Sequence, residues 1–175
     1  SRAKAKVLQF LIDWLHIEDG REVVKDPSRF PEFSEDVAAA MRTSLLLFLD
    51  DVVWGTDSDY RKFFTDETVF LNGSIAPLFD IPLKKSATFR PLRIDDGQRA
   101  GIVTHPYMMS MLSYADSTSP IHRGVFLARS ILGNVLKPPV NAIAPLSAHI
   151  HPDLTTRERV SLQTKASACQ TCHAM

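Results

Sequence analysis

The segment from Val37 to Trp54 constrains the fold most, because it is a helical segment with more apolar positions than a surface helix usually has. Its apolar side chains outnumber the positions in one stripe of a surface helix; they include Leu45, Leu46, Phe48, Leu49, Val52 and Val53. Ser34 is a good N-cap for this helix, and Gly55 is expected to end it. We therefore expect a central buried helix around which the other elements pack.

Most of the remaining chain also has a helical pattern. Apolar residues recur with a 3.6-residue period, and caps are recognisable, in segments 2–17, 105–114 and 118–132. Thr155 or Thr156 is expected to cap a last helix, with Glu158 in its first turn. Segment 81–94, with two prolines and alternating apolar residues, predicts an extended piece or short hairpin. The predicted class is mainly α.

Charge and hydropathy exclude some partners. Lys and Arg number 20, as do Asp and Glu, so the chain has no net basic character to attract nucleic acid. No apolar run is long enough for a membrane span.

The chain opens at Ser1 in the middle of a helical pattern and stops at Met175, soon after a cysteine motif. We interpret it as a fragment of a longer protein.

The cysteine motif is Cys169-Gln-Thr-Cys172-His173. Cys-x-x-Cys holds two thiols at the spacing that the vinyl groups of a c-type haem require, and the next His reaches the iron. The motif therefore predicts a covalently attached haem c, with His173 as axial iron ligand. The complete fold prediction is a helical domain with a short extended segment or hairpin and a C-terminal haem-c motif. This chemistry places the protein in the periplasm or outside the cell.

Three other interpretations of the cysteines stay open. They can form a redox dithiol, although no strand precedes them as in thioredoxin-like motifs. They can form a structural disulfide, which a helical core of this size does not need. They can also bind zinc together with His149 and His151, since His-x-His and Cys-x-x-Cys supply four ligands. Haem is favoured because it alone accounts for His173.

The leading functional hypothesis is an electron carrier rather than a catalyst. Its partner would be a redox protein or a small-molecule electron donor or acceptor. A haem-dependent oxidative enzyme is the alternative, and it needs an open iron position beside a distal His or Arg; the candidates are His105, Arg99 and Arg123. His105 is thus a candidate distal ligand, although a structural role is the stronger interpretation of it. No catalytic residue is assigned.

Ser119-Pro120 is interpreted as the start of a helix, because Ser caps well and Pro suits the first turn. Gly124 would then lie inside that helix, where it costs stability relative to Ala. We therefore expect another backbone or the haem edge to approach Gly124 closely. The aspartate pairs Asp50-Asp51 and Asp95-Asp96, with Asp57 and Asp59, are expected to be structural.

Several motifs occur in an order that resembles a known family. They are Lys25-Asp, Phe30-Pro-Glu-Phe, Asn72-Gly-Ser-Ile-Ala, Arg99-Ala-Gly-Ile-Val-Thr-His, Thr118-Ser-Pro-Ile-His-Arg-Gly-Val-Phe, Leu154-Thr-Thr-Arg-Glu-Arg and Cys169-Gln-Thr-Cys-His. The order resembles that in large exported bacterial proteins with cytochrome-c-like motifs, catalogued as domains of unknown function fifteen-ninety-two and fifteen-eighty-eight. The resemblance implies a first domain over residues 1–82 and a second over 95–175, packed as one unit.

The resemblance implies extracytoplasmic redox chemistry but no established activity. Two features depart from the family pattern. The chain lacks the acidic-Pro-x-Gly-Phe segment that follows the haem motif in family members, and their proline-rich tract is reduced here to Pro138-Pro139.

Overall fold

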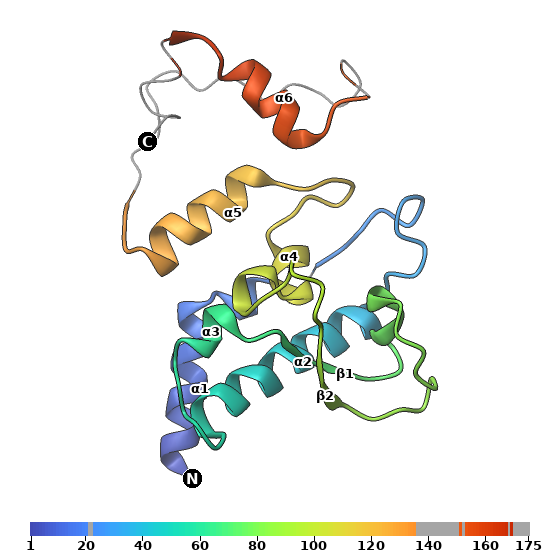
Figure 1. Cartoon of the computed structure of the whole chain (residues 1–175), viewed down its shortest axis with the longest axis vertical. Coiled ribbons are helices and arrows are strands. Elements are labelled where there is room, and N and C mark those ends of the chain that lie inside the picture. Colours follow the sequence, from blue (N-terminus) through green and yellow to red (C-terminus); the bar gives the residue numbers. More distant parts are fainter. Residues whose placement is uncertain (21–22, 136–150, 152, 168, 170–175) are drawn as a thin grey trace. The chain divides into compact units, whose positions relative to one another are not determined.

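The computed structural model describes residues 1–20, 23–135, 151, 153–167 and 169. The chain divides into two compact units, Ser1–Ser117 and Thr118–Met175, called unit 1 and unit 2 below. Figure 1 shows α1 to α4 and both strands in unit 1, and α5 and α6 in unit 2. The two predicted domain ranges remain a prediction.

The central element of unit 1 is α2 (Glu35–Trp54). Ser34 caps it as predicted, because its side chain accepts a hydrogen bond from the N–H of Val37 at 3.2 Å. Leu45 and Leu49 are fully buried, and other buried side chains follow on the same helix. The prediction of a buried central helix is therefore confirmed.

Helix α1 (Arg2–Trp14) packs on α2 and contributes Leu11 and Ile12 to the core. It ends earlier than the periodicity predicted, because His16 adopts a left-handed conformation with φ of 54°. The chain then continues as the short 3-10 helix η1 (Ile17–Gly20).

A two-stranded antiparallel sheet covers another part of α2. It pairs β1 (Thr68–Leu71) with β2 (Arg90–Arg93), with Val69 opposite Leu92. Val69 and Leu71 of β1 are buried, whereas β2 is mostly exposed. Pro91 lies in this exposed strand, where a missing N–H costs no ladder hydrogen bond and discourages pairing with another chain.

Short elements complete unit 1. They are α3 (Lys62–Thr65), η2 (Ala76–Phe79), η3 (Ile102–Thr104) and α4 (Pro106–Met111).

The loop before α2 is fixed at Lys25, whose ammonium donates to the Ser110 carbonyl, the Ser113 hydroxyl and the Tyr114 carbonyl, all at 2.7–2.8 Å. Lys25 thereby binds one carbonyl in the last turn of α4 and one in the loop that follows it.

Unit 2 contains α5 (Pro120–Phe126), the π-helical turn η4 (Leu127–Ile131) and α6 (Thr156–Gln163). Thr155 caps α6 in a capping box with Glu158, so the predicted start of this helix is confirmed. Among its described residues, Ser119 and Phe126 are buried.

The predicted fold class is wrong. About half of the described structure is helical, and it includes a small two-stranded sheet. Strand β1 was missed, and the helices expected over 105–114 and 118–132 are shorter or interrupted. Much of residues 55–105 is instead loop held by turns. The C-terminal haem-c motif is not part of the described fold, because only Cys169 of its three residues is described. No described helix is long and apolar enough to cross a membrane.

Candidate functional site

Cys169 is the member of the predicted haem motif that the structure describes. It follows α6, and its N–H donates to the carbonyl of Ala166 at 2.9 Å. Its thiol is free and the residue is partly exposed. A partly exposed thiol is accessible for addition to a porphyrin vinyl group. Cys172 and His173 lie outside the described residues, as does His149 of the zinc alternative.

Arg159 fixes the segment that leads into α6. Its guanidinium donates to the carbonyls of His151 and Leu154 and to the hydroxyl of Thr156. His151, the second candidate zinc ligand, is therefore held through its backbone next to α6. In the described part of the chain, no group of three His, Cys, Asp or Glu side chains gathers as a metal site.

His105, the candidate distal ligand, lies in the core of unit 1 with 2% of its surface exposed. Its Nδ1 accepts a hydrogen bond from the N–H of Tyr107 at 3.3 Å, which makes His105 the N-cap of α4. Its Nε2 lies 3.3 Å from Oγ of Ser44 on α2. Burial lowers the pKa of His105 from 6.5 to about 3, so the ring is neutral at pH 7.

This geometry determines the tautomer of His105. Because Nδ1 accepts the amide proton of Tyr107, the ring proton is on Nε2 and points to Ser44. Both ring nitrogens are therefore occupied by hydrogen bonds within unit 1. The arrangement favours a structural role for His105, which was also the stronger interpretation of the sequence.

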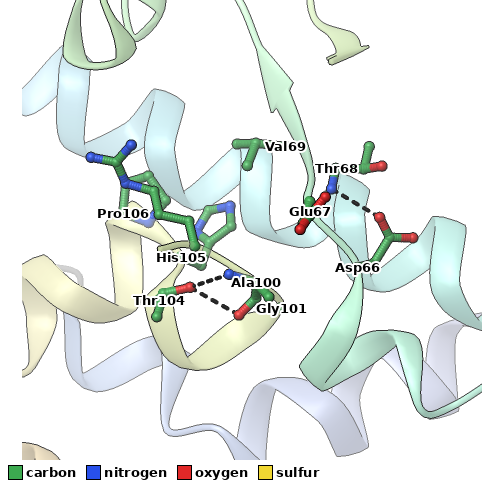
Figure 2. Close-up of a pocket in the computed structure, with 10 residues that line it drawn as sticks. Asp66, Glu67, Thr68, Val69, Ala100, Gly101, Thr104, His105 and Pro106 are labelled. Carbon is green, nitrogen blue, oxygen red and sulfur yellow. Dashed lines mark hydrogen bonds between the residues drawn. The ribbon is translucent and has the colours of Figure 1, made fainter. Parts of the chain in front are cut away.

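The segment Arg99–His105 forms a tight turn beside β1 (Figure 2). Thr104 closes it, because its hydroxyl accepts from the Ala100 N–H at 2.7 Å and donates to the Ala100 carbonyl at 2.8 Å. Gly101 has φ of 59° and ψ of −161°, a backbone conformation that only glycine adopts readily. A Cβ at Gly101 would lie 2.1 Å from the carbonyl oxygen of Phe63. The conformation of this turn therefore accounts for the glycine and the threonine of the Arg-x-Gly-x-x-Thr-His motif.

The turn encloses a cavity of about 10 Å³, which has room for one water molecule. Its wall includes Glu67 and the His105 ring (Figure 2). A second, open hollow of about 360 Å³ shares four residues with this cavity, Glu67, Arg99, Ala100 and Thr104. Glu67 Oε2 lies 2.8 Å from the guanidinium of Arg93, a charge contact without hydrogen-bond geometry.

These side chains do not form a recognisable catalytic arrangement. Arg99 is paired with Asp96 at 2.6 Å, and its guanidinium lies 5.2 Å from the Phe79 ring centroid. Asp96 also accepts hydrogen bonds from the N–H groups of Gln98 and Arg99, which lower its pKa. The structural role predicted for Asp96 agrees with these contacts.

The other aspartates of the predicted set are held in a similar way. Asp59 pairs with Arg61 at 2.7 Å, and Asp57 pairs with Lys62 at 2.6 Å. Asp50 lies 4.0 Å from the ammonium of Lys4. The pairs of Asp57 and Asp59 are local, whereas that of Asp50 joins α2 to α1; all are at least partly exposed, so each contributes little to stability.

Ser119 and Pro120 begin α5 as predicted. The Ser119 hydroxyl accepts from the His122 N–H at 3.2 Å, and Pro120 is in the first turn. A Cβ at Gly124 would meet no heavy atom within 4 Å, so the expected approach of another backbone is not found among the described residues. The alternative, an approach by the haem edge, stays a prediction.

Sequence reasoning missed three residues that organise unit 1. Lys25, Ser44 and Thr104 each make a buried or partly buried polar contact. Ser44 carried a signal, since it is a polar residue inside an otherwise apolar helix. Lys25 appears in the family motif Lys25-Asp, but its structural role had no signal, because its partners lie 85–89 residues away.

Comparison with known families agrees with the order of motifs. Residues 1–81 match the family model PSD4, described as a protein of unknown function (DUF1592). Residues 99–175 match the model PSCyt3, described as a protein of unknown function (DUF1588). No curated protein and no solved structure matches the chain. The two families named in the resemblance are thereby confirmed for these ranges, whereas the haem motif stays a prediction.

Proposed function

We propose that this chain is a c-type haem-binding electron-transfer module of an exported protein. Cys169 and Cys172 would hold the haem through thioether bonds, and His173 would bind its iron. The observation that carries the proposal is the Cys-x-x-Cys-His sequence, which matches the chemical requirements of haem attachment. The short name of the model that matches residues 99–175, PSCyt3, supports a cytochrome-like domain.

The described part of the site is compatible with this chemistry. The Cys169 thiol is free and partly exposed just after α6. The capping box at Thr155 and Glu158 fixes the start of α6, and Arg159 fixes the chain before it. This chain's own residues would therefore present the first attachment thiol six residues after the end of a capped helix. A bound haem supplies an iron that changes by one electron between ferrous and ferric.

An electron carrier is favoured over a haem-dependent oxidative enzyme. The enzyme needs a free distal acid–base group. His105 has both nitrogens engaged, Arg99 is paired with Asp96, and Arg123 also has an interaction partner. A carrier needs none of these groups. Its partner would be a redox protein or a small-molecule donor or acceptor, in the periplasm or outside the cell, where haem c is attached.

The test is to express the chain with an export signal and the haem-attachment machinery, then denature it and extract with acid. We expect the haem to stay with the polypeptide and the mass to rise by one haem. Cys169→Ser with Cys172→Ser is the matched control, which should lose the haem. A bare polypeptide containing about one zinc per chain would overturn the proposal and favour a zinc site.

A second measurement separates carrier from enzyme. A carrier has both axial positions of its iron filled. Poor binding of carbon monoxide by the reduced, haem-loaded chain would therefore favour the carrier and show that a ligand other than His105 lies opposite His173. Rapid binding, together with peroxide turnover, would favour the enzyme.

A further inference from the structure

Helix α1 carries two apolar stripes. The first, which includes Leu11 and Ile12, is buried in the core of unit 1. The second is formed by residues that recur at intervals of four, three and four positions and therefore lie along one side of the helix. We call it the second stripe; its members are Ala3, Val7, Phe10 and Trp14. The two stripes are centred about 120° apart around the helix, so the second lies beside the core contact rather than in it.

The second stripe is only partly covered within the described structure. Phe10 is 63% exposed, and Ala3 is exposed as well. The Phe10 ring stacks on Trp14, with centroids 6.2 Å apart and planes inclined by 13°. Trp14 in turn packs edge-on against the buried Phe63, at 6.5 Å between centroids. The stripe thus presents aromatic rings held in place at a surface, which is typical of a protein interface.

Two opposite charges flank the second stripe. Lys6 and Asp13 are both exposed, and their spacing of seven residues places them on the same side of the stripe. Asp13 is in the last turn of α1, where the negative end of the helix disfavours a carboxylate, and no basic residue shares that turn. Its hydrogen bond from Gln9, at 2.8 Å, comes from a neutral donor. The stability of α1 itself therefore gives no reason for Asp13.

An antiparallel second copy of α1 fits both the stripe and the charges. When Val7 lies opposite Phe10 of the second copy, Ala3 lies opposite Trp14 of the second copy. The same register brings Lys6 of each copy beside Asp13 of the other copy. The contact is two-fold symmetric, so this charge pair forms twice. A parallel pair would place Lys6 beside Leu11 instead, without an opposite charge.

We propose that two copies of this chain associate through α1, antiparallel, along the second stripe. The association covers the exposed Phe10 and gives Asp13 a cationic partner. It does not depend on a haem. Because α1 spans 13 residues, or about 20 Å, the interface is small and the dissociation constant is on the order of 100 µM at low salt.

Sedimentation equilibrium of the full chain tests the inference, with a reductant present to prevent disulfides between chains. We expect a reversible dimer that weakens as salt rises from about 50 to about 500 mM. Phe10→Asp should weaken it at least about tenfold, whereas Lys85→Glu, at an exposed position elsewhere in unit 1, should not. A chain that stays monomeric at about 1 mM, because another part of it covers the stripe, would overturn the inference. Equal association of Phe10→Asp and the natural chain would overturn it too.

An exchange of charges tests the antiparallel register. Lys6→Glu and Asp13→Lys should each weaken the dimer about tenfold, because each puts two like-charge contacts into the symmetric interface. Asp13→Lys also places a cation at the C-terminal end of α1, so the folded chain should lose no stability. Mixed in equal amounts, the two variants should associate as strongly as the natural chain, because both contacts again join opposite charges. A mixture that associates no better than either variant alone would overturn the antiparallel pairing.

Discussion

Ser44 and His105 lie 61 residues apart in the sequence and form a buried polar pair that links α2 to α4. Oγ of Ser44 on α2 lies 3.3 Å from Nε2 of the His105 ring, which caps α4 through its other nitrogen. The pair places a neutral, ionisable ring in the core of unit 1. It therefore connects the stability of that unit to pH.

Acidification should destabilise unit 1 through His105. The folded-state pKa is lowered to about 3 from 6.5, so between these values the unfolded chain binds more protons. The stability that unit 1 gains from a neutral His105 is complete above pH 6.5 and is lost as the pH falls toward 3. From pH 7 to pH 5 we expect a loss of about 2 kcal/mol in the free energy of unfolding. Urea titrations at the two pH values measure it.

His105→Asn is the informative variant, because Asn can cap α4 but does not titrate. Its stability at pH 7 should be lower, and its loss between pH 7 and pH 5 should nearly vanish. His122→Gln, on α5, is the control and should keep the natural pH dependence. An unchanged pH dependence in His105→Asn would mean that another group is responsible.

The Gly101 turn gives a prediction with a matched pair of glycines. Gly101 and Gly97 have similar φ values, 59° and 63°, but only Gly101 is enclosed. Gly101→Ala should cost about 3 kcal/mol or more, because its Cβ would be forced against the Phe63 carbonyl. Gly97→Ala should cost about 1 kcal/mol, the price of a left-handed conformation in open space. Thermal denaturation of both variants checks the difference; equal costs would contradict the assigned close approach.

Lys25 should contribute more to stability than an exposed lysine does. Lys25→Met removes the donor to the Ser110 and Tyr114 carbonyls, so we expect a loss of about 2–3 kcal/mol. Lys85→Met, at an exposed position, should change stability by less than about 0.5 kcal/mol. Chemical denaturation measures both. Similar small effects would show that the Lys25 contacts contribute no net stabilisation.

Sequence reasoning succeeded where the cause is local. The N-cap Ser34, the first turn of α5 at Ser119 and Pro120, and the capping box at Thr155 all depend on residues within one helical turn. The burial of α2 was also predictable, because its excess of apolar positions is visible in the sequence.

Sequence reasoning failed where the cause is a distant partner. Strand β1 is four residues long, and its pairing with β2 joins segments about twenty residues apart, so neither periodicity nor length identified it. The roles of Lys25 and Ser44 depend on α4, which is remote in the sequence. For the candidate site, the cysteine motif was visible at once, whereas the hydrogen bonds that engage His105 were not.

Gly124 is the position where the structure reverses the expected effect of a substitution. It lies inside α5, where glycine is less favourable than alanine by about 0.5–1 kcal/mol. A Cβ added there meets no heavy atom within 4 Å, so alanine introduces no clash. In the haem-loaded chain, Gly124→Ala should therefore raise the hydrogen-exchange protection of α5 about two- to fivefold. Ala128→Gly, in η4, should lower protection by a similar factor. Loss of protection in Gly124→Ala would instead place a haem edge or another group against Gly124, as the sequence first suggested.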